Sequence, residues 1–167
     1  MIRYLPDEPL PAVPYVPGKT ARPLDVDDHD ARGGELVSND PPRLLLRGLD
    51  LFNHGYYWEA HEAWEELWHV EERRGLAADL LKGLIALAAA GVKARQGNAA
   101  GVSHHAERAA ALFAKVRDMR ADSRALQMRL PLAKLIGHAE ALARSPIVDD
   151  SQDVTAVAVL LFRVELE

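Results

Sequence analysis

The spacing of apolar residues predicts that most of the chain beyond residue 40 is helical. Apolar positions recur every three or four residues, which is the period of a helix with one buried face. Glycine and asparagine interrupt this pattern at the predicted helix ends, at Gly55, Gly75, Gly97 and Asn98. The predicted helices cover about 41–54, 56–72, 76–96, 98–117 and 131–143, and the polar stretch 118–129 is compatible with partial helix. We therefore predict an all-α fold, a compact helical bundle of about five helices with short connections.

The two ends of the chain break this helical pattern in different ways. Residues 1–40 hold six of the ten prolines, which favour an extended arm, and enough apolar residues for the arm to dock on the bundle. Residues 146–167 end in a β-branched, partly alternating run that fits either a strand pairing with the arm or a late helix. The predicted organisation is a proline-rich arm (1–40), a helical bundle domain (41–145) and a C-terminal segment packed on the bundle (146–167).

Composition limits the kinds of protein this chain can be. Its 167 residues suffice for one hydrophobic core, and 49% hydrophobic with 27% charged residues is typical of a soluble globular domain. The net charge is −5 and the 20 Lys and Arg residues are scattered, so we expect no nucleic-acid partner. The absence of cysteine excludes disulfides, thiolate catalysis and cysteine-based zinc sites.

The sequence also gives an expectation for location. The N-terminal residues lack the apolar region of a signal peptide. The most apolar run is bracketed by Lys82 and Lys93, so no membrane-spanning segment and no membrane partner are predicted. We therefore expect a cytoplasmic protein.

Residues 61–69, His-Glu-Ala-Trp-Glu-Glu-Leu-Trp-His, hold the candidate chemistry. At 100° per residue, His61 and Glu65 fall inside an arc of aromatic side chains that is predicted to be buried. A buried carboxylate without a partner is costly, so these two residues, one helical turn apart, are expected to pair. A separate acidic stripe on the same helix should face water. It comprises Glu59, Glu62, Glu66 and His69, and Glu62 lies at its boundary with the aromatic arc.

Two interpretations of this pair remain open. In the first, His61 and Glu65 form a structural pair that satisfies its own hydrogen bonds inside the core. In the second they line a pocket for a small ligand or a divalent metal, with an acid–base role for both residues and for Glu62. The candidate catalytic residues are then His61, Glu62 and Glu65, and the candidate pocket walls are Tyr57, Trp64, Trp68 and His105.

The segment resembles the zinc-protease helix His-Glu-x-x-His but departs from it at one ligand. That motif needs a second histidine four residues after the first, where this chain has Glu65. A histidine and a carboxylate can still ligate Zn, Fe or Mn if a third ligand comes from elsewhere, and His105 is the best candidate by position. The chain contains none of the patterns GxGxxG, GxxxxGK[ST] or GxSxG, so nucleophilic catalysis has no candidate residue.

Residues 51–68, LFNHGYYWEAHEAWEELW, resemble the signature of a bacterial and archaeal family catalogued as domain-of-unknown-function family 309. A second block, residues 81–90 followed by GNAAG at 97–101, is similar to the next helix and turn of that family, so the resemblance spans roughly 43–117. It implies a compact all-α bundle of unassigned activity. The signature positions that match are Phe52, Asn53, Gly55, Tyr57, Glu59, His61, Glu62, Glu65 and Trp68.

The resemblance bears on the site in two ways. Its pattern contains Glu62 as well as His61 and Glu65, which favours a pocket because a purely structural pair would not need Glu62. Family members often carry glutamines where this chain has Lys82 and Ala86, so a site that used those glutamines would be altered here.

These observations lead to two functional hypotheses. In the first, the protein binds a small molecule or a divalent metal at the His61 site, and the sequence leaves open both enzymatic activity and the identity of any cofactor. In the second, it is a non-enzymatic interaction or assembly module in which the His61–Glu65 pair is structural. A homo-oligomer is compatible with either hypothesis, because alanines occupy the nominally exposed positions Ala78, Ala86 and Ala89.

Overall fold

The computed structural model describes residues 3–23, 42–71, 73–119 and 123–167, and these residues form helices and extended connections without a strand. These elements confirm the predicted all-α bundle of about five helices, because five of the helices are substantial and the other, α5 (Ser123–Gln127), is short. Residue 41, where the first predicted helix begins, lies outside the described residues. The helices are α1 (Arg43–Asn53), α2 (Tyr57–Val70), α3 (Gly75–Arg95), α4 (Ala99–Asp118), α5 (Ser123–Gln127) and α6 (Leu132–Arg144).

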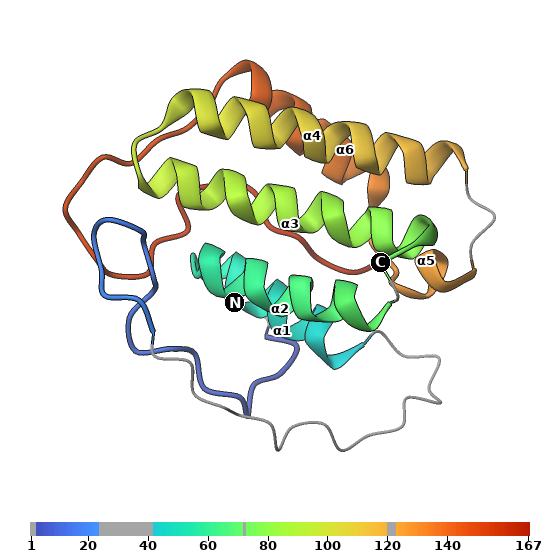
Figure 1. The fold of residues 1–167 in the computed structure, drawn as a ribbon, viewed down its shortest axis with the longest axis horizontal. Helices are drawn as coiled ribbons and strands as arrows, with labels where there is room; N and C mark the ends of the chain where they lie inside the picture. Colours follow the sequence, from blue (N-terminus) through green and yellow to red (C-terminus); the bar gives the residue numbers. More distant parts are fainter. Residues whose placement is uncertain (1–2, 24–41, 72, 120–122) are drawn as a thin grey trace.

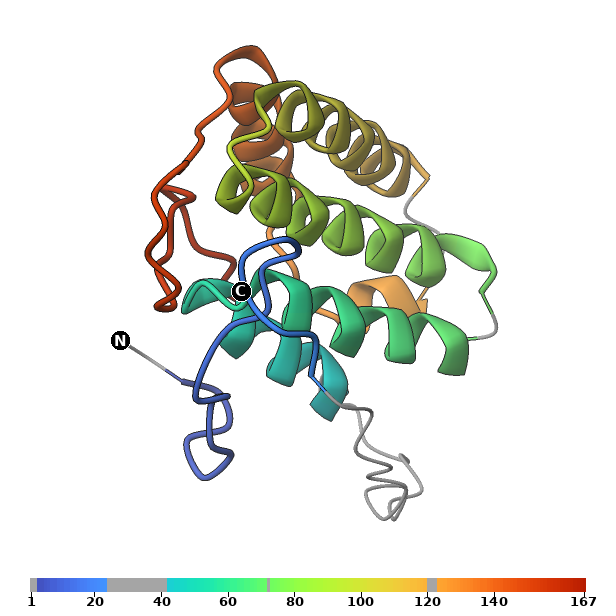
Figure 2. The ribbon, with the colours of Figure 1, turned by 60° about the vertical axis from the view of Figure 1, so that its left-hand side comes forward.

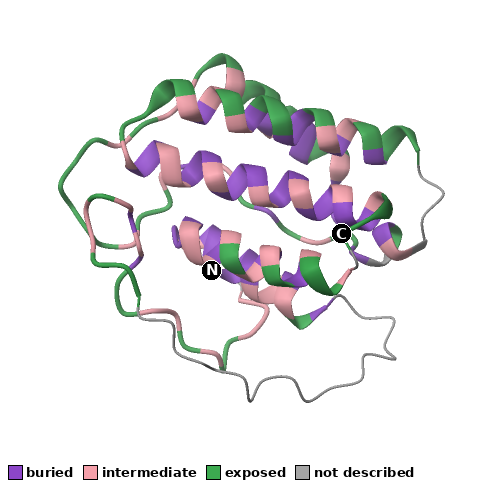
Figure 3. Ribbon diagram, in the orientation of Figure 1, coloured by how far each residue is buried: buried purple, intermediate pink, exposed green. Residues whose placement is uncertain are grey.

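Helix α3 runs through the centre of the bundle, with α1 and α2 on one side and α4 and α6 on the other (Figure 1). Contrary to expectation, α3 is long and apolar enough to span a membrane by length and composition alone. Its place in the middle of the bundle accounts for that composition, because neighbouring helices cover it on both sides (Figure 3). Ala78 and Ala86, which were expected to be exposed, are 0% and 4% exposed, so the alanine-based argument for self-association loses these two residues.

Helices α1 and α2 pack closely because Gly48 has no side chain. A Cβ atom at this position would lie 2.0 Å from Trp64 Nε1. Trp64 is fully buried, and its indole nitrogen donates a hydrogen bond to the carbonyl oxygen of Leu45, 3.3 Å away. Trp64 thus fixes α2 against α1 and determines which face of α2 turns inward.

The turn before α2 and the turn after α3 lie where glycine and asparagine predict helix ends. Gly55, between α1 and α2, has φ +87°, and a Cβ atom there would lie 2.5 Å from the backbone of Val157. Asn98, which the sequence places at a helix end, caps α4, with its Oδ1 accepting a hydrogen bond from the Gly101 N–H at 2.8 Å.

The described part of the N-terminal arm, residues 3–23, docks on α1 and α2, which confirms the expectation of docking for these residues. The backbone N–H groups of Tyr4 and Leu5 donate to the two carboxylate oxygens of the buried Asp50, at 2.8 and 2.9 Å. Further along, the Tyr15 N–H donates to Glu59 Oε1 at 2.7 Å. Asp50 and Glu59, two carboxylates on helices, thus accept backbone hydrogen bonds from the proline-rich arm.

The C-terminal segment, residues 146–167, contains neither helix nor strand, so both alternatives for its structure were wrong. Side chains of the bundle satisfy its backbone instead. The Asn53 amide bonds Val164 in both directions, donating to its carbonyl at 2.8 Å and accepting from its N–H at 2.9 Å. The buried Arg95 guanidinium donates to the carbonyl oxygens of Asp153 and Thr155 at 2.7 and 3.0 Å. Figure 2 shows this segment running along the bundle as an irregular chain. The proposed domain boundaries themselves stay predictions.

Candidate metal-binding site

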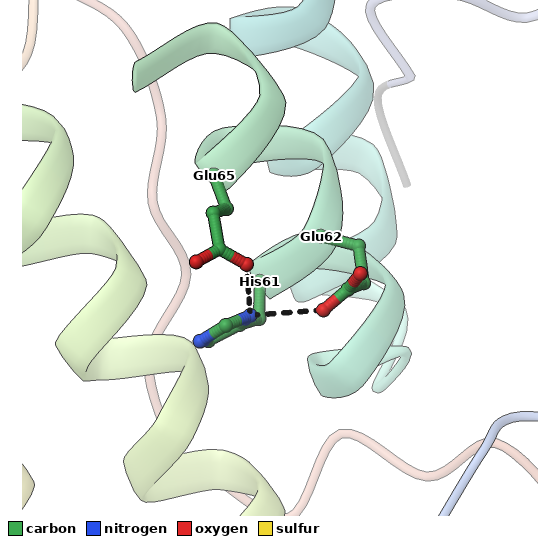
Figure 4. Close-up of side chains that lie close together, drawn as sticks. All are labelled: His61, Glu62 and Glu65. Carbon is green, nitrogen blue, oxygen red and sulfur yellow. Dashed lines mark hydrogen bonds and ion pairs between the residues drawn. The ribbon is translucent and has the colours of Figure 1, made fainter. Parts of the chain in front are cut away.

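His61, Glu62 and Glu65 meet on one side of α2. His61 Nδ1 lies 3.3 Å from Glu62 Oε1 and 3.8 Å from Glu65 Oε2, and Figure 4 shows both carboxyl groups directed toward this ring nitrogen. One ligand atom from each of the three residues lies within 4.8 Å of the others. The sequence placed Glu65 one turn above His61, and the structure adds Glu62 as the nearer carboxylate.

The expectation that His61 and Glu65 are buried was wrong. The side chains of His61, Glu62 and Glu65 are 28%, 47% and 42% exposed. The buried stripe of α2 consists instead of Tyr57, Ala60, Trp64 and Leu67. The helical wheel grouped all aromatic residues of α2 into one buried arc, whereas the line of α2 that carries His61, Glu65 and Trp68 lies at the edge of the core, where water reaches it.

The four predicted wall residues do not form one pocket around His61. Trp64 packs under α1, and Tyr57 lies in the core against Gly91, where its hydroxyl accepts a hydrogen bond from the Leu160 N–H at 3.0 Å. Trp68 is half-buried nearer the end of α2, with the Arg73 guanidinium 5.4 Å and the Lys82 ammonium 5.6 Å from its ring centre. Burial raises the pKa of Tyr57 to about 12, consistent with its structural place.

His105 lies on α4 and outside the three-residue cluster. It is half-buried, and burial is the main cause of its lowered pKa, followed by the charges of His104, Lys93, Arg108 and His61. The ring nitrogens of His105 are not among the potential ligand atoms that lie within 4.8 Å of one another in the cluster. Glu62, and not His105, therefore supplies the third ligand atom of the cluster.

An open groove between α1 and α2 adjoins the cluster. Glu62 and Glu65 contribute to its wall, so two of the three potential ligands border a space that a small molecule can enter from solvent. Arg47 of α1 also lines the groove, which gives it one cationic residue among the acidic ones. The remaining lining residues are Leu44, Leu51, Ala63, Glu66, His69 and Val70.

A known protein family matches the part of the chain that contains this site. The model of the family described as "Domain of unknown function (DUF309)" matches residues 45–104. The chain carries a DUF309 domain. Its limits enclose α1 from Leu45, all of α2 and α3, and the first residues of α4, and therefore the complete cluster. No curated protein sequence matches the chain.

Six of the nine residues that match the family signature form two groups in the structure. Asn53 and Tyr57 bind the backbone of the C-terminal segment, and Gly55 leaves room for it. His61, Glu62 and Glu65 form the exposed cluster. The sequence did not reveal that Asn53 and Tyr57 bind the C-terminal segment. The one signal for this role was the position of Asn53, a polar residue beside Phe52 at the end of an apolar helix face. The catalytic roles assigned to the second group stay predictions.

Proposed function

We propose that the DUF309 domain binds a divalent transition-metal ion, such as Zn²⁺, through His61, Glu62 and Glu65. The observation that supports this proposal is the convergence of three potential ligand atoms within 4.8 Å on one helix. In a tetrahedral zinc site with bonds of about 2.0–2.1 Å, two ligand atoms are separated by about 3.3 Å. The 3.3 Å and 3.8 Å distances from His61 Nδ1 are close to that value, and the third separation is within 4.8 Å, which supports the proposal.

The electrostatics of the cluster also favour a cation. Two carboxylates directed at one imidazole nitrogen repel one another, and a divalent ion between them removes that repulsion. One imidazole and two carboxylates suit Zn, Fe or Mn. The partial exposure of all three side chains speaks against the alternative of a sealed structural pair.

Three protein ligands leave at least one coordination position for water, which is the arrangement of catalytic rather than structural zinc sites. A bound ion would lower the pKa of that water and polarise a carbonyl or phosphoryl group nearby. The groove between α1 and α2 gives a substrate access to the ion, because Glu62 and Glu65 line it. Metal-assisted hydrolysis is therefore the reaction class that we propose for this site.

The proposal is tested by titrating the metal-free full chain with Zn²⁺, Mn²⁺ and Co²⁺, following heat and the visible spectrum of Co²⁺. Glu65→Gln and His61→Gln are expected to weaken binding by at least about tenfold, because each removes one of three ligands. Glu66→Gln and His69→Gln are matched controls on the same helix, outside the cluster, and should bind metal like the unaltered chain. Stoichiometric binding that is equally weakened in the controls, or no binding by the unaltered chain, would overturn the proposal.

A further inference from the structure

A second, smaller cavity lies at the end of the bundle away from the His61 cluster, between α3, α4 and α5. Its volume is about 130 Å³, and it is partly enclosed. Leu80, Val116, Ala125 and Leu130 supply buried apolar surface to it. A protein cavity of about 150 Å³ is known to admit one benzene ring. This space therefore fits one branched aliphatic or aromatic side chain.

Two residues of opposite charge line the same cavity. Arg129 follows α5, and Glu167 comes to it from the far end of the C-terminal segment. The Glu167 N–H donates to the Arg129 carbonyl oxygen at 2.9 Å, which holds the two residues side by side, and Figure 1 draws the chain end beside α5. Within the described part of the chain, neither side chain forms an ion pair, so both charges are available to a ligand.

The backbone at Arg129 is itself unusual. Its φ is +51°, in the left-handed region that favours glycine, at the position just after a helix where glycine is the preferred residue. An arginine here strains the backbone beside the cavity that Arg129 lines. Strained positions of this kind are a reason to look for a function of the side chain.

From this combination we infer that the cavity binds a free α-amino acid with an apolar side chain of about the size of leucine. The side chain fills the apolar interior, Arg129 pairs with the carboxylate, and Glu167 pairs with the ammonium group. A zwitterion is the ligand class that satisfies both charges at once, whereas a simple carboxylate would be repelled by Glu167 and a simple amine by Arg129. This site is independent of the proposed metal site.

The first test dissects the ligand. L-leucine is titrated into the full chain in the presence of EDTA, followed by calorimetry or NMR, and compared with three compounds that each lack one part of it. These are 4-methylpentanoate without the ammonium group, 3-methylbutylamine without the carboxylate, and glycine without the side chain. Leucine is expected to bind at least about tenfold more tightly than each, since one charge-assisted contact, or the burial of one leucine side chain, is worth at least that factor. A fragment that binds as tightly as leucine, or no leucine binding at about 10 mM, would overturn the inference.

The second test uses a matched pair of arginines. Arg129→Gly removes the charge and also relieves the backbone strain, so the fold is expected to survive. Arg73→Gly removes the same charge from a second left-handed position, φ +60°, beside Trp68 and outside the cavity. Leucine affinity should fall at least about tenfold in the first variant and stay within about twofold in the second. Equal affinities in the two variants would contradict the assignment.

Discussion

Two groups of polar side chains only a few residues apart, Asn53 with Tyr57 and His61 with Glu62 and Glu65, have opposite surroundings. Asn53 and Tyr57 are buried, and their partners are backbone groups of Val164 and Leu160. The three residues of the cluster are partly exposed, and the partners of His61 are the two carboxylates. A polar group that holds the protein's own backbone stabilises the fold, whereas convergent ligand-type groups at the surface remain available to an ion. The following changes test this contrast.

The largest effect is expected from Asn53→Ala. Two buried hydrogen bonds to Val164 are lost, and each backbone group left without a partner costs about 1–3 kcal/mol, so the free energy of unfolding should fall by about 3 kcal/mol. Urea denaturation followed by circular dichroism measures this change. Asn98→Ala is the matched control, because it removes an exposed helix cap and should cost about 1 kcal/mol. Equal losses in the two variants would show that Asn53 is no anchor.

A smaller effect, with a distinctive pH dependence, is expected from Tyr57→Phe. The variant keeps the ring against Gly91 but leaves the Leu160 N–H without its acceptor, at about 1 kcal/mol near neutral pH. Burial raises the pKa of Tyr57 from 10.0 to about 12, because the folded protein disfavours the phenolate. The stability due to the neutral phenol is therefore complete below pH 10 and is lost between pH 10 and about 12.

Denaturation of the unaltered chain and of Tyr57→Phe across this pH range isolates the contribution of Tyr57. The unaltered chain should lose about 2–3 kcal/mol more than the variant between these two pH values. Tyr56, whose pKa is also raised by burial and by the charge of Glu59, is present in both proteins and cancels in the difference. Parallel pH profiles would mean that the Tyr57 hydroxyl is not buried in solution.

The smallest effect on stability is expected from His61→Gln. Because His61 is partly exposed and contacts exposed carboxylates, the free energy of unfolding without metal should change by less than about 0.5 kcal/mol. Thermal denaturation measures this change. The same variant should lose metal binding, so stability and binding separate at this residue. A loss of about 2 kcal/mol or more in stability would place His61 with Asn53 among the structural residues.

Much of the helical framework could be predicted from the sequence, because its signals are local. Gly55 ends one helix, Asn98 caps another, and the apolar period locates the helices between them. The C-terminal segment could not be predicted, since its apolar run indicates burial without indicating a partner. Its partners, Asn53 and Tyr57, lie about a hundred residues away along the chain.

The candidate site shows the same division. The one-turn spacing of His61 and Glu65 follows from the sequence, and the structure confirms that they approach one another. Their exposure does not follow from it, because the aromatic arc of α2 is wider than the face its neighbours cover. Gly48 in α1 has no side chain and so leaves room for the Trp64 ring. This packing sets the rotation of α2 about its axis and leaves His61 at the edge of the core.

The sequence by itself therefore determined the helices, their ends and the set of side chains that share one side of α2. Tertiary structure alone decided which of those side chains are buried and which polar residues hold the non-helical ends. The physical reason is that helix formation and side-chain spacing depend on neighbours within about one turn, whereas burial and backbone hydrogen bonding of the tail depend on contacts between distant segments.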